Sequence, residues 1–357
     1  MGLRLSTLFN DAPHDLQAKV IAIYAILLGF NVAAWVWAAM AFRHFPVLLG
    51  TALLAYSLGL RHAVDADHIA AIDNVTRKLM QQGRRPVAVG FMFSLGHSSI
   101  VVLGAAALAG TALALQHHYL ERVKNIGAVV GTSVSAFFLL AIAVINLIIL
   151  RSIYGAFVRV RQGQPYTEED FDLLLGSRGF LARLFRPVFQ MINRSWHMYP
   201  LGVLFGLGFD TATEIGVLGI SAAEASKGLS FWSILVFPVL FAAGMCLIDT
   251  TDNILMLGAY GWAFVKPIRK LYYNMTITSV SVIVALVIGG VETLGLLGGQ
   301  FHLRGRFWDG IAVLNENFGT LGFFIVGLFV FSWIVSIAVY KWRRLDDIPK
   351  LPEVPFD

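Results

Sequence analysis

The chain has 357 residues, of which 57% are apolar and 14% are charged, whereas soluble globular domains are about 45–50% apolar and about 25% charged. This composition excludes an ordinary soluble fold. At about 20 mostly apolar residues per membrane-crossing helix, the chain has material for roughly seven to nine spans. The net charge of +5 is small and gives no sign of nucleic-acid binding. A single cysteine, Cys246, excludes a Cys-rich metal site, so metal chemistry must use histidines and carboxylates.

Eight apolar stretches predict an all-α polytopic membrane protein with eight transmembrane helices. They lie at 20–42, 47–74, 87–112, 126–150, 198–222, 231–262, 274–298 and 319–340. We expect an N-terminal half, 1–150, and a C-terminal half, 198–357, of four helices each, joined by a cytoplasmic linker, 151–197. Leu58-Gly59-Leu60 in the second span resembles Leu207-Gly208-Phe209 in the fifth. Because these spans run in opposite directions, the match predicts an inverted repeat.

The basic residues predict the orientation of the spans. The terminal segments and alternate loops on their side carry 20 Lys and Arg residues, whereas the loops on the other side carry 6. Lysine and arginine accumulate in cytoplasmic loops. We therefore expect a multi-pass protein of a bacterial cytoplasmic (inner) membrane with both termini in the cytoplasm.

The second span carries ionisable residues where lipid should be. Its apolar run ends at Leu60, so the predicted helix must continue through Arg61 to His68. At about 100° per residue, His62, Asp65 and His68 share a face about 120° wide, while Asp67 points elsewhere. Two imidazoles and a carboxylate suit a divalent ion such as Ni²⁺, Co²⁺ or Zn²⁺. The alternative is that Arg61 neutralises Asp65 and the histidines only hydrogen-bond within the bundle.

The third span places a histidine near the middle of the membrane. His97 lies ten residues after Val87, which is about 15 Å along a helix. Ser94 and Ser98 are at helical spacing beside it and are expected to supply hydroxyl groups. His97 is a candidate metal ligand, and the alternative is a histidine satisfied by packing.

Two further spans carry acidic residues without a basic residue within a helical turn. Asp210 and Glu214 lie one turn apart in the fifth span, and Asp249 and Asp252 lie three residues apart in the sixth. Unpaired acids in hydrocarbon are costly and point to a cation site or a proton relay. We therefore add these four carboxylates to the candidate metal residues.

The four polar motifs together resemble those of the nickel/cobalt transporter family, closest to the hydrogenase-associated nickel permeases of bacteria. The motifs are Arg61 to Ile69, Phe93 to Ser98, Leu207 to Glu214, and Gly244-Met245-x-x-x-Asp249-Thr250. The resemblance implies an eight-helix secondary transporter that takes up Ni²⁺, in some members Co²⁺ as well, with high affinity. The hallmark His-x4-Asp-His element of the family matches His62, Asp67 and His68.

The expected function is therefore import of Ni²⁺, with the ion as substrate and no cofactor. The chain has no GxxxxGK[ST] phosphate-binding loop, and nothing in it indicates an ATPase subunit. The alternatives are transport of another divalent metal or an intramembrane metal-dependent enzyme. An enzyme is disfavoured because the sequence has no His-Glu-x-x-His zinc helix and too few histidines near the membrane for a di-iron site.

Overall fold

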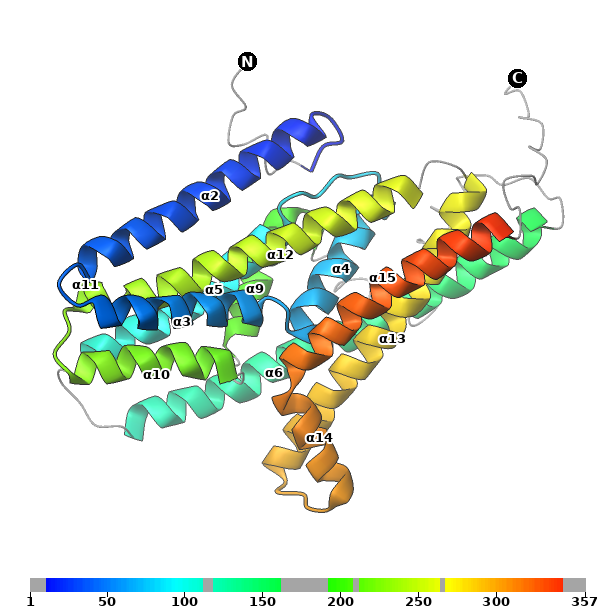
Figure 1. Ribbon diagram of the computed structural model, residues 1–357. Coiled ribbons are helices and arrows are strands. Elements are labelled where there is room, and N and C mark those ends of the chain that lie inside the picture. Colours follow the sequence, from blue (N-terminus) through cyan, green and yellow to red (C-terminus); the bar gives the residue numbers. More distant parts are fainter. Residues whose placement is uncertain (1–10, 112–117, 162–191, 208–211, 264–266, 343–357) are drawn as a thin grey trace.

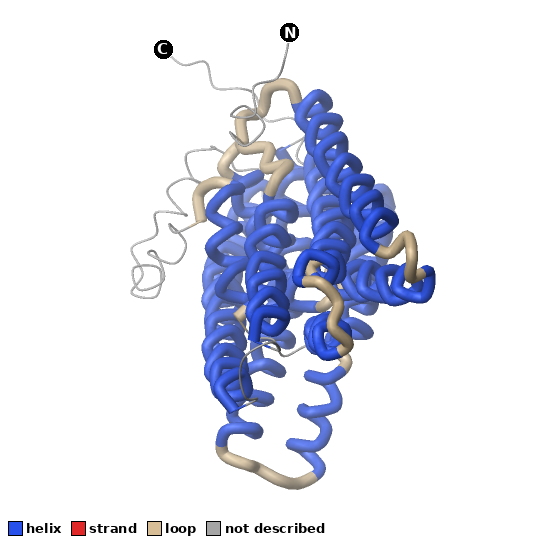
Figure 2. The backbone as a smooth tube through the Cα atoms, turned by 90° about the vertical axis from the view of Figure 1, so that its left-hand side faces the viewer, coloured by secondary structure: helices blue, strands red, loops and turns tan. Residues whose placement is uncertain are grey.

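The computed structural model describes residues 11–111, 118–161, 192–207, 212–263 and 267–342. The described residues form helices and connecting loops, with no strand (Figures 1 and 2). The helices are α2 (Leu16–Ala41), α3 (Pro46–His62), α4 (Ala66–Gln81), α5 (Val89–Thr111), α6 (His118–Arg161), α9 (Met198–Gly206), α10 (Ala212–Ser226), α11 (Phe231–Ile234), α12 (Val236–Ala263), α13 (Pro267–Gln300), α14 (Arg306–Glu316) and α15 (Phe318–Trp342). The 3₁₀ turn η1 (Ser195–His197) precedes α9.

The helices confirm an all-helical membrane protein. Five helical segments in the described part are long and apolar enough to cross a membrane, and the number rises to seven if each of two bent helix pairs counts as one span. The predicted fifth span, 198–222, falls on α9 and α10, which lie on either side of residues 208–211. The full count of eight spans stays a prediction.

The second span differs from the continuous helix expected from the sequence. It consists of α3 and α4, which meet at an angle of 51°. The helix ends at His62 and restarts at Ala66, so the expectation of one unbroken helix through Arg61 and His68 was wrong. Gly322 of α15 packs directly on the carbonyl of Val64 in this break, where a side chain would collide with the backbone.

Two segments that connect predicted spans contain helix in the structure. The loop predicted after residue 74 contains the last turns of α4, in which Arg77 and Lys78 are buried. The predicted outer loop 299–318 contains α14, an amphipathic helix bent by 79° from α15. Figures 1 and 2 show that α14 and the end of α13 project from one end of the bundle.

α12 lies at the centre of the helix packing, against α2, α3, α4 and α5 (Figure 1). Glycines permit its closest approaches. Gly59 of α3 contacts the backbone of Phe241, and Gly244 of α12 contacts the backbone of Tyr56. Small residues allow membrane helices to pack closely without a large apolar interface.

The same arrangement recurs where α9 packs on α5. Gly202 of α9 contacts the backbone of Phe93, and Gly96 of α5 contacts that of Tyr199. The sequence Tyr-x-Leu-Gly thus occurs on α3 (56–59) and α9 (199–202), each time opposite a Phe-x-x-Gly sequence on α12 or α5. These equivalent contacts support an internal repeat, in a register different from the Leu-Gly match expected from the sequence.

Candidate metal centre

The break between α3 and α4 positions the first two site residues. Asp65 lies in the break with an extended backbone, at the position that caps the N-terminus of α4. A carboxylate at this position ordinarily accepts a backbone N–H of the helix, but Asp65 makes no such bond. Its Oδ2 instead lies 2.9 Å from Nδ1 of His62. The break, rather than a shared helical face, brings these residues together.

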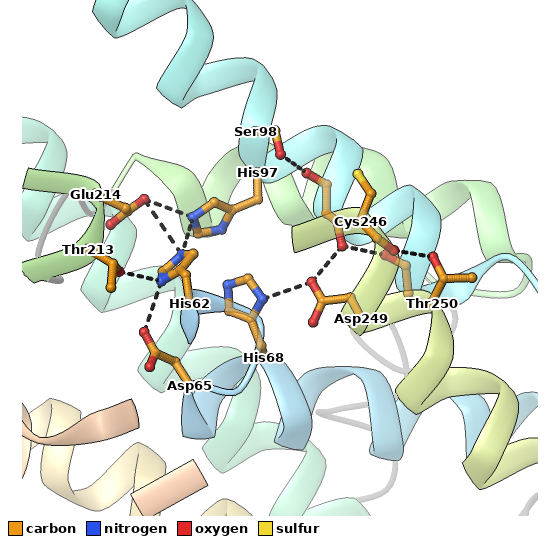
Figure 3. A network of polar contacts seen from close by, with 12 residues as sticks. His62, Asp65, His68, His97, Ser98, Thr213, Glu214, Cys246, Asp249 and Thr250 are labelled. Atoms are coloured by element: carbon orange, nitrogen blue, oxygen red, sulfur yellow. Dashed lines mark hydrogen bonds and ion pairs between the residues drawn. The ribbon is translucent and has the colours of Figure 1, made fainter. Parts of the chain in front are cut away.

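Three histidines from three helices meet in the interior (Figure 3). His62 ends α3, His68 lies in the first turn of α4, and His97 lies on α5. Ligand nitrogens of the three rings lie within 4.8 Å of one another. The side chains are at most 2% exposed. In the described part of the chain, this is the one group of three or more His, Cys, Asp or Glu residues close enough to hold a metal ion together.

Glu214 of α10 joins two of these histidines. Its Oε1 lies 2.8 Å from Nε2 of His97 and 4.0 Å from Nε2 of His62. The same two ring nitrogens are 3.0 Å apart. At this distance they can share only one proton, so at least one of them presents a lone pair. Nitrogen lone pairs beside a carboxylate form an environment for a cation.

Asp249 of α12 orients His68. Its Oδ2 lies 3.0 Å from Nδ1 of His68 and 2.5 Å from Oγ of Ser94. Metal-binding histidines usually donate the N–H that does not face the ion to a carboxylate or carbonyl, which fixes the tautomer. Nε2 of His68 is buried and has no hydrogen-bond partner in the described residues. A proton on Nδ1 therefore leaves the lone pair of Nε2 available to an ion.

The structure brings together most of the candidates named from the sequence. Those found in the cluster are His62, Asp65, His68, His97, Glu214 and Asp249. Asp67 is half-buried in the first turn of α4, and its charge acts on His97. Asp252 lies one turn beyond Asp249 and hydrogen-bonds none of the three histidines. Asp210 falls outside the described residues.

Two local details differ from the sequence interpretation. Arg61 is exposed and makes no ion pair with Asp65 among the described contacts, although its charge still acts on Asp65; the alternative of local neutralisation therefore remains an alternative for this pair. Thr213, which the sequence interpretation did not single out, places its Oγ1 3.1 Å from Nδ1 of His62. Its position directly before Glu214 is the signal that could have identified it.

The donor set determines which ions fit. Imidazole nitrogens with a carboxylate oxygen suit Ni²⁺, Co²⁺ and Zn²⁺, whereas Cu(I) prefers thiolates and thioethers. Cys246 is buried on α12 but is not part of the histidine cluster.

Comparison with known proteins identifies the family. Residues 48–339 match the family model described as high-affinity nickel-transport protein, NicO. The chain belongs to this family. The match includes all three histidines of the cluster and both carboxylates that contact His97 and His68.

Curated relatives of the NicO chain align over most of their length. It is 66% identical to the high-affinity nickel transport protein of Cupriavidus necator, covering 93% of this chain and 94% of that one. It is 52% identical to the hydrogenase nickel incorporation protein HupN of Bradyrhizobium diazoefficiens, covering 89% and 83%. It is 41% identical to the cobalt transport protein NhlF of Rhodococcus rhodochrous, covering 88% and 90%. No solved structure matches the chain.

Proposed function

We propose that this protein is a secondary transporter that imports Ni²⁺ across the bacterial cytoplasmic membrane for the maturation of metalloenzymes. The observation that carries the proposal is the pair of His68 and Asp249, in which a carboxylate orients a fully buried imidazole whose Nε2 has no hydrogen-bond partner among the described residues. The names of the relatives in Cupriavidus necator and Bradyrhizobium diazoefficiens support nickel as the ion.

The ion is cargo rather than a resident cofactor, and the geometry favours specific roles. His62, His68 and His97 supply the ligand nitrogens, and Glu214 supplies a carboxylate oxygen. Asp65 and Asp249 orient His62 and His68 through their Nδ1 atoms. The other candidates, Asp67, Asp210 and Asp252, are assigned to the path before or after this centre.

Burial of the centre requires the protein to move during transport. The three histidines are at most 2% exposed, so an ion held by them is closed off from water. Transporters commonly bind substrate at interrupted helices and open alternately to the two sides. The break at 63–65 and the first turn of α10 lie beside the cluster, because Asp65, Thr213 and Glu214 contact its histidines. We assign the alternating movement to the break between α3 and α4, driven by a gradient rather than by ATP.

We place both termini in the cytoplasm and assign eight spans, with domain limits at 1–150, 151–197 and 198–357. The charge bias of the loops supports this orientation. Reporter fusions after Trp342 and within 223–230 test it. A cytoplasmic reporter should be active at the first site, and a periplasmic reporter should be active at the second.

Co²⁺ is the second candidate ion because a relative in Rhodococcus rhodochrous is named a cobalt transporter and the same donors bind it. For a given site, Co²⁺ ordinarily binds less tightly than Ni²⁺. We therefore expect Ni²⁺ to compete against Co²⁺ better than the reverse.

The deciding experiment measures uptake into liposomes that contain the purified protein, with ⁶³Ni and ⁵⁷Co in mutual competition. Wild-type protein and the exposed control His302→Ala should take up nickel, and His68→Ala should not. Equal uptake by His68→Ala would reject the assigned centre. Absence of uptake by correctly folded wild-type protein would reject the transport proposal and leave a binding or enzymatic role.

A further inference from the structure

A second group of buried polar side chains lies beyond the histidine cluster, toward the C-terminal end of α4. Asp73 lies five residues after His68, which is about 7.5 Å further along the helix, and is fully buried. Its Oδ2 accepts a hydrogen bond from Ser281 at 2.6 Å, and its Oδ1 accepts one from the hydroxyl of Tyr260. Both oxygens of this carboxylate are therefore held by neutral donors.

Arg77 lies one turn after Asp73 and is 1% exposed. Its Nη1 donates to Thr278 at 2.8 Å, and its Nη2 donates to Asn74 at 2.9 Å. Nε has no hydrogen-bond partner, and the guanidinium makes no ion pair with any described carboxylate. The positive charge is thus buried and held in place by neutral groups. It remains close enough to Asp73 for the two charges to interact.

Asp252 connects this region to the histidine cluster. It lies one turn after Asp249 on α12 and interacts electrostatically with both Asp249 and Asp73. Its Oδ2 is buried and has no hydrogen-bond partner among the described residues. Asp249, Asp252 and Asp73 therefore form a series of carboxylates that starts at His68. Arg77 is the cation at its far end.

Buried carboxylates require a compensating positive charge. We propose that Arg77 supplies this charge to Asp73 while the ion path is empty, and that the divalent ion takes its place beside Asp73 after leaving His68 and Asp249. We call Asp73 and Arg77 the inner charge pair. Because Arg77 and the ion compete for the carboxylate of Asp73, the arginine prevents the ion from being retained there. The inference rests on the proposed function and adds a release step to it.

A purely structural role makes a different prediction. Arg77 also ties α4 to α13 through Thr278, and in that case only its hydrogen bonds would matter. Replacing Asp73 in addition to Arg77 would then reduce nickel uptake further. If charge balance matters, removing the negative charge of Asp73 should restore the nickel uptake that is lost when Arg77 is replaced.

The test combines equilibrium binding of ⁶³Ni to the purified full-length protein with initial uptake rates in liposomes. Arg77→Gln should tighten binding or add a second bound ion, and should slow uptake, each by a factor in the range of about 5–150 that is typical of coupled sites. Arg77→Lys keeps the charge and should retain most of the uptake. Tyr260→Phe, the matched control, removes a hydrogen bond to Asp73 without changing charge and should affect binding little.

The double variant Asp73→Asn with Arg77→Gln decides between the two roles. We expect it to take up nickel faster than either single variant, because it has no uncompensated charge. Slower uptake by the double variant than by both single variants would overturn the proposal. The proposal would also be overturned if Arg77→Gln lowered binding and uptake in the same proportion. If Arg77→Gln does not fold, the comparison of the double variant with Asp73→Asn alone still decides.

These outcomes are separable from failure of the proposed function. If wild-type protein neither binds nor transports ⁶³Ni, nickel transport itself is refuted. If wild-type protein transports nickel, His68→Ala abolishes binding, and the double variant shows no recovery, only the inner charge pair is refuted.

Discussion

Nδ1 of His68 lies 3.0 Å from Oδ2 of Asp249, and this contact joins α4 to α12 across 181 positions of the sequence. Both side chains are fully buried. A carboxylate that accepts the Nδ1 proton fixes one tautomer and raises the basicity of Nε2. The contact therefore links the packing of two helices to the affinity of the proposed ion site.

Removing the charge of Asp249 should weaken metal binding. Asp249→Asn keeps the shape of the side chain, and we expect the affinity for nickel to fall about 10–100-fold, as is typical when a partner behind a ligand is changed. Equilibrium binding of ⁶³Ni to the purified protein measures the effect. The control Asp309→Asn changes an exposed acid on α14 and should bind normally. Unchanged affinity in Asp249→Asn would contradict the role of Asp249.

Loss of any of the three histidines should be more severe. His62→Ala, His68→Ala and His97→Ala each remove a proposed ligand, so binding should fall by more than the roughly 100-fold upper range for supporting residues. The amount of protein in the membrane must be measured alongside binding. Wild-type affinity in any one of the three variants would remove that histidine from the ligand set.

Glu214 should contribute through its charge. Glu214→Gln retains a hydrogen-bonding group beside His97 but no longer neutralises a divalent ion, so we expect a higher KM for nickel uptake with less change in the maximal rate. Glu224→Gln on the same helix is the matched control, because Glu224 pairs with the exposed Lys227. Equal effects of the two substitutions would indicate that Glu214 has no special role.

Asp65 and Asp67 should behave differently although only two positions separate them. Asp65 contacts His62, so Asp65→Asn should reduce affinity about 10–100-fold. Asp67 is expected to stay outside the direct ligand shell. An experimental structure with nickel bound checks this, because a carboxylate oxygen of Asp67 at about 2.0–2.2 Å from the ion would make it a ligand.

The glycine contacts predict a selective effect on stability. In Gly59→Ala the new methyl group would collide with the backbone of Phe241, and in Gly202→Ala it would collide with that of Phe93. Each should destabilise the folded protein by about 1–3 kcal/mol or more. Gly50→Ala on α3 meets no atom within 4 Å and should be neutral. Thermal unfolding in detergent compares the three variants, and equal stability would show that α3 and α9 can shift.

The sequence by itself determined the class of protein and the chemistry of its site. Apolar stretches of spanning length require helices, because every backbone polar group in lipid must be paired within its own segment. Ionisable residues such as His97 and Asp249 were recognisable because charges in hydrocarbon are costly without a function. These conclusions depend on local composition alone, which is why they needed no coordinates.

Only the tertiary structure decided which of these residues meet. Helical periodicity assumed a continuous second span, whereas packing of Gly322 of α15 against Val64 accompanies a break that turns Asp65 toward His62. Arg77 lies beyond residue 74, where the second span was predicted to end, yet neutral partners on α13 and α4 hold it in the interior. Contacts such as that between His68 and Asp249 join distant positions. They depend on how helices pack against one another, and a single sequence does not specify that packing.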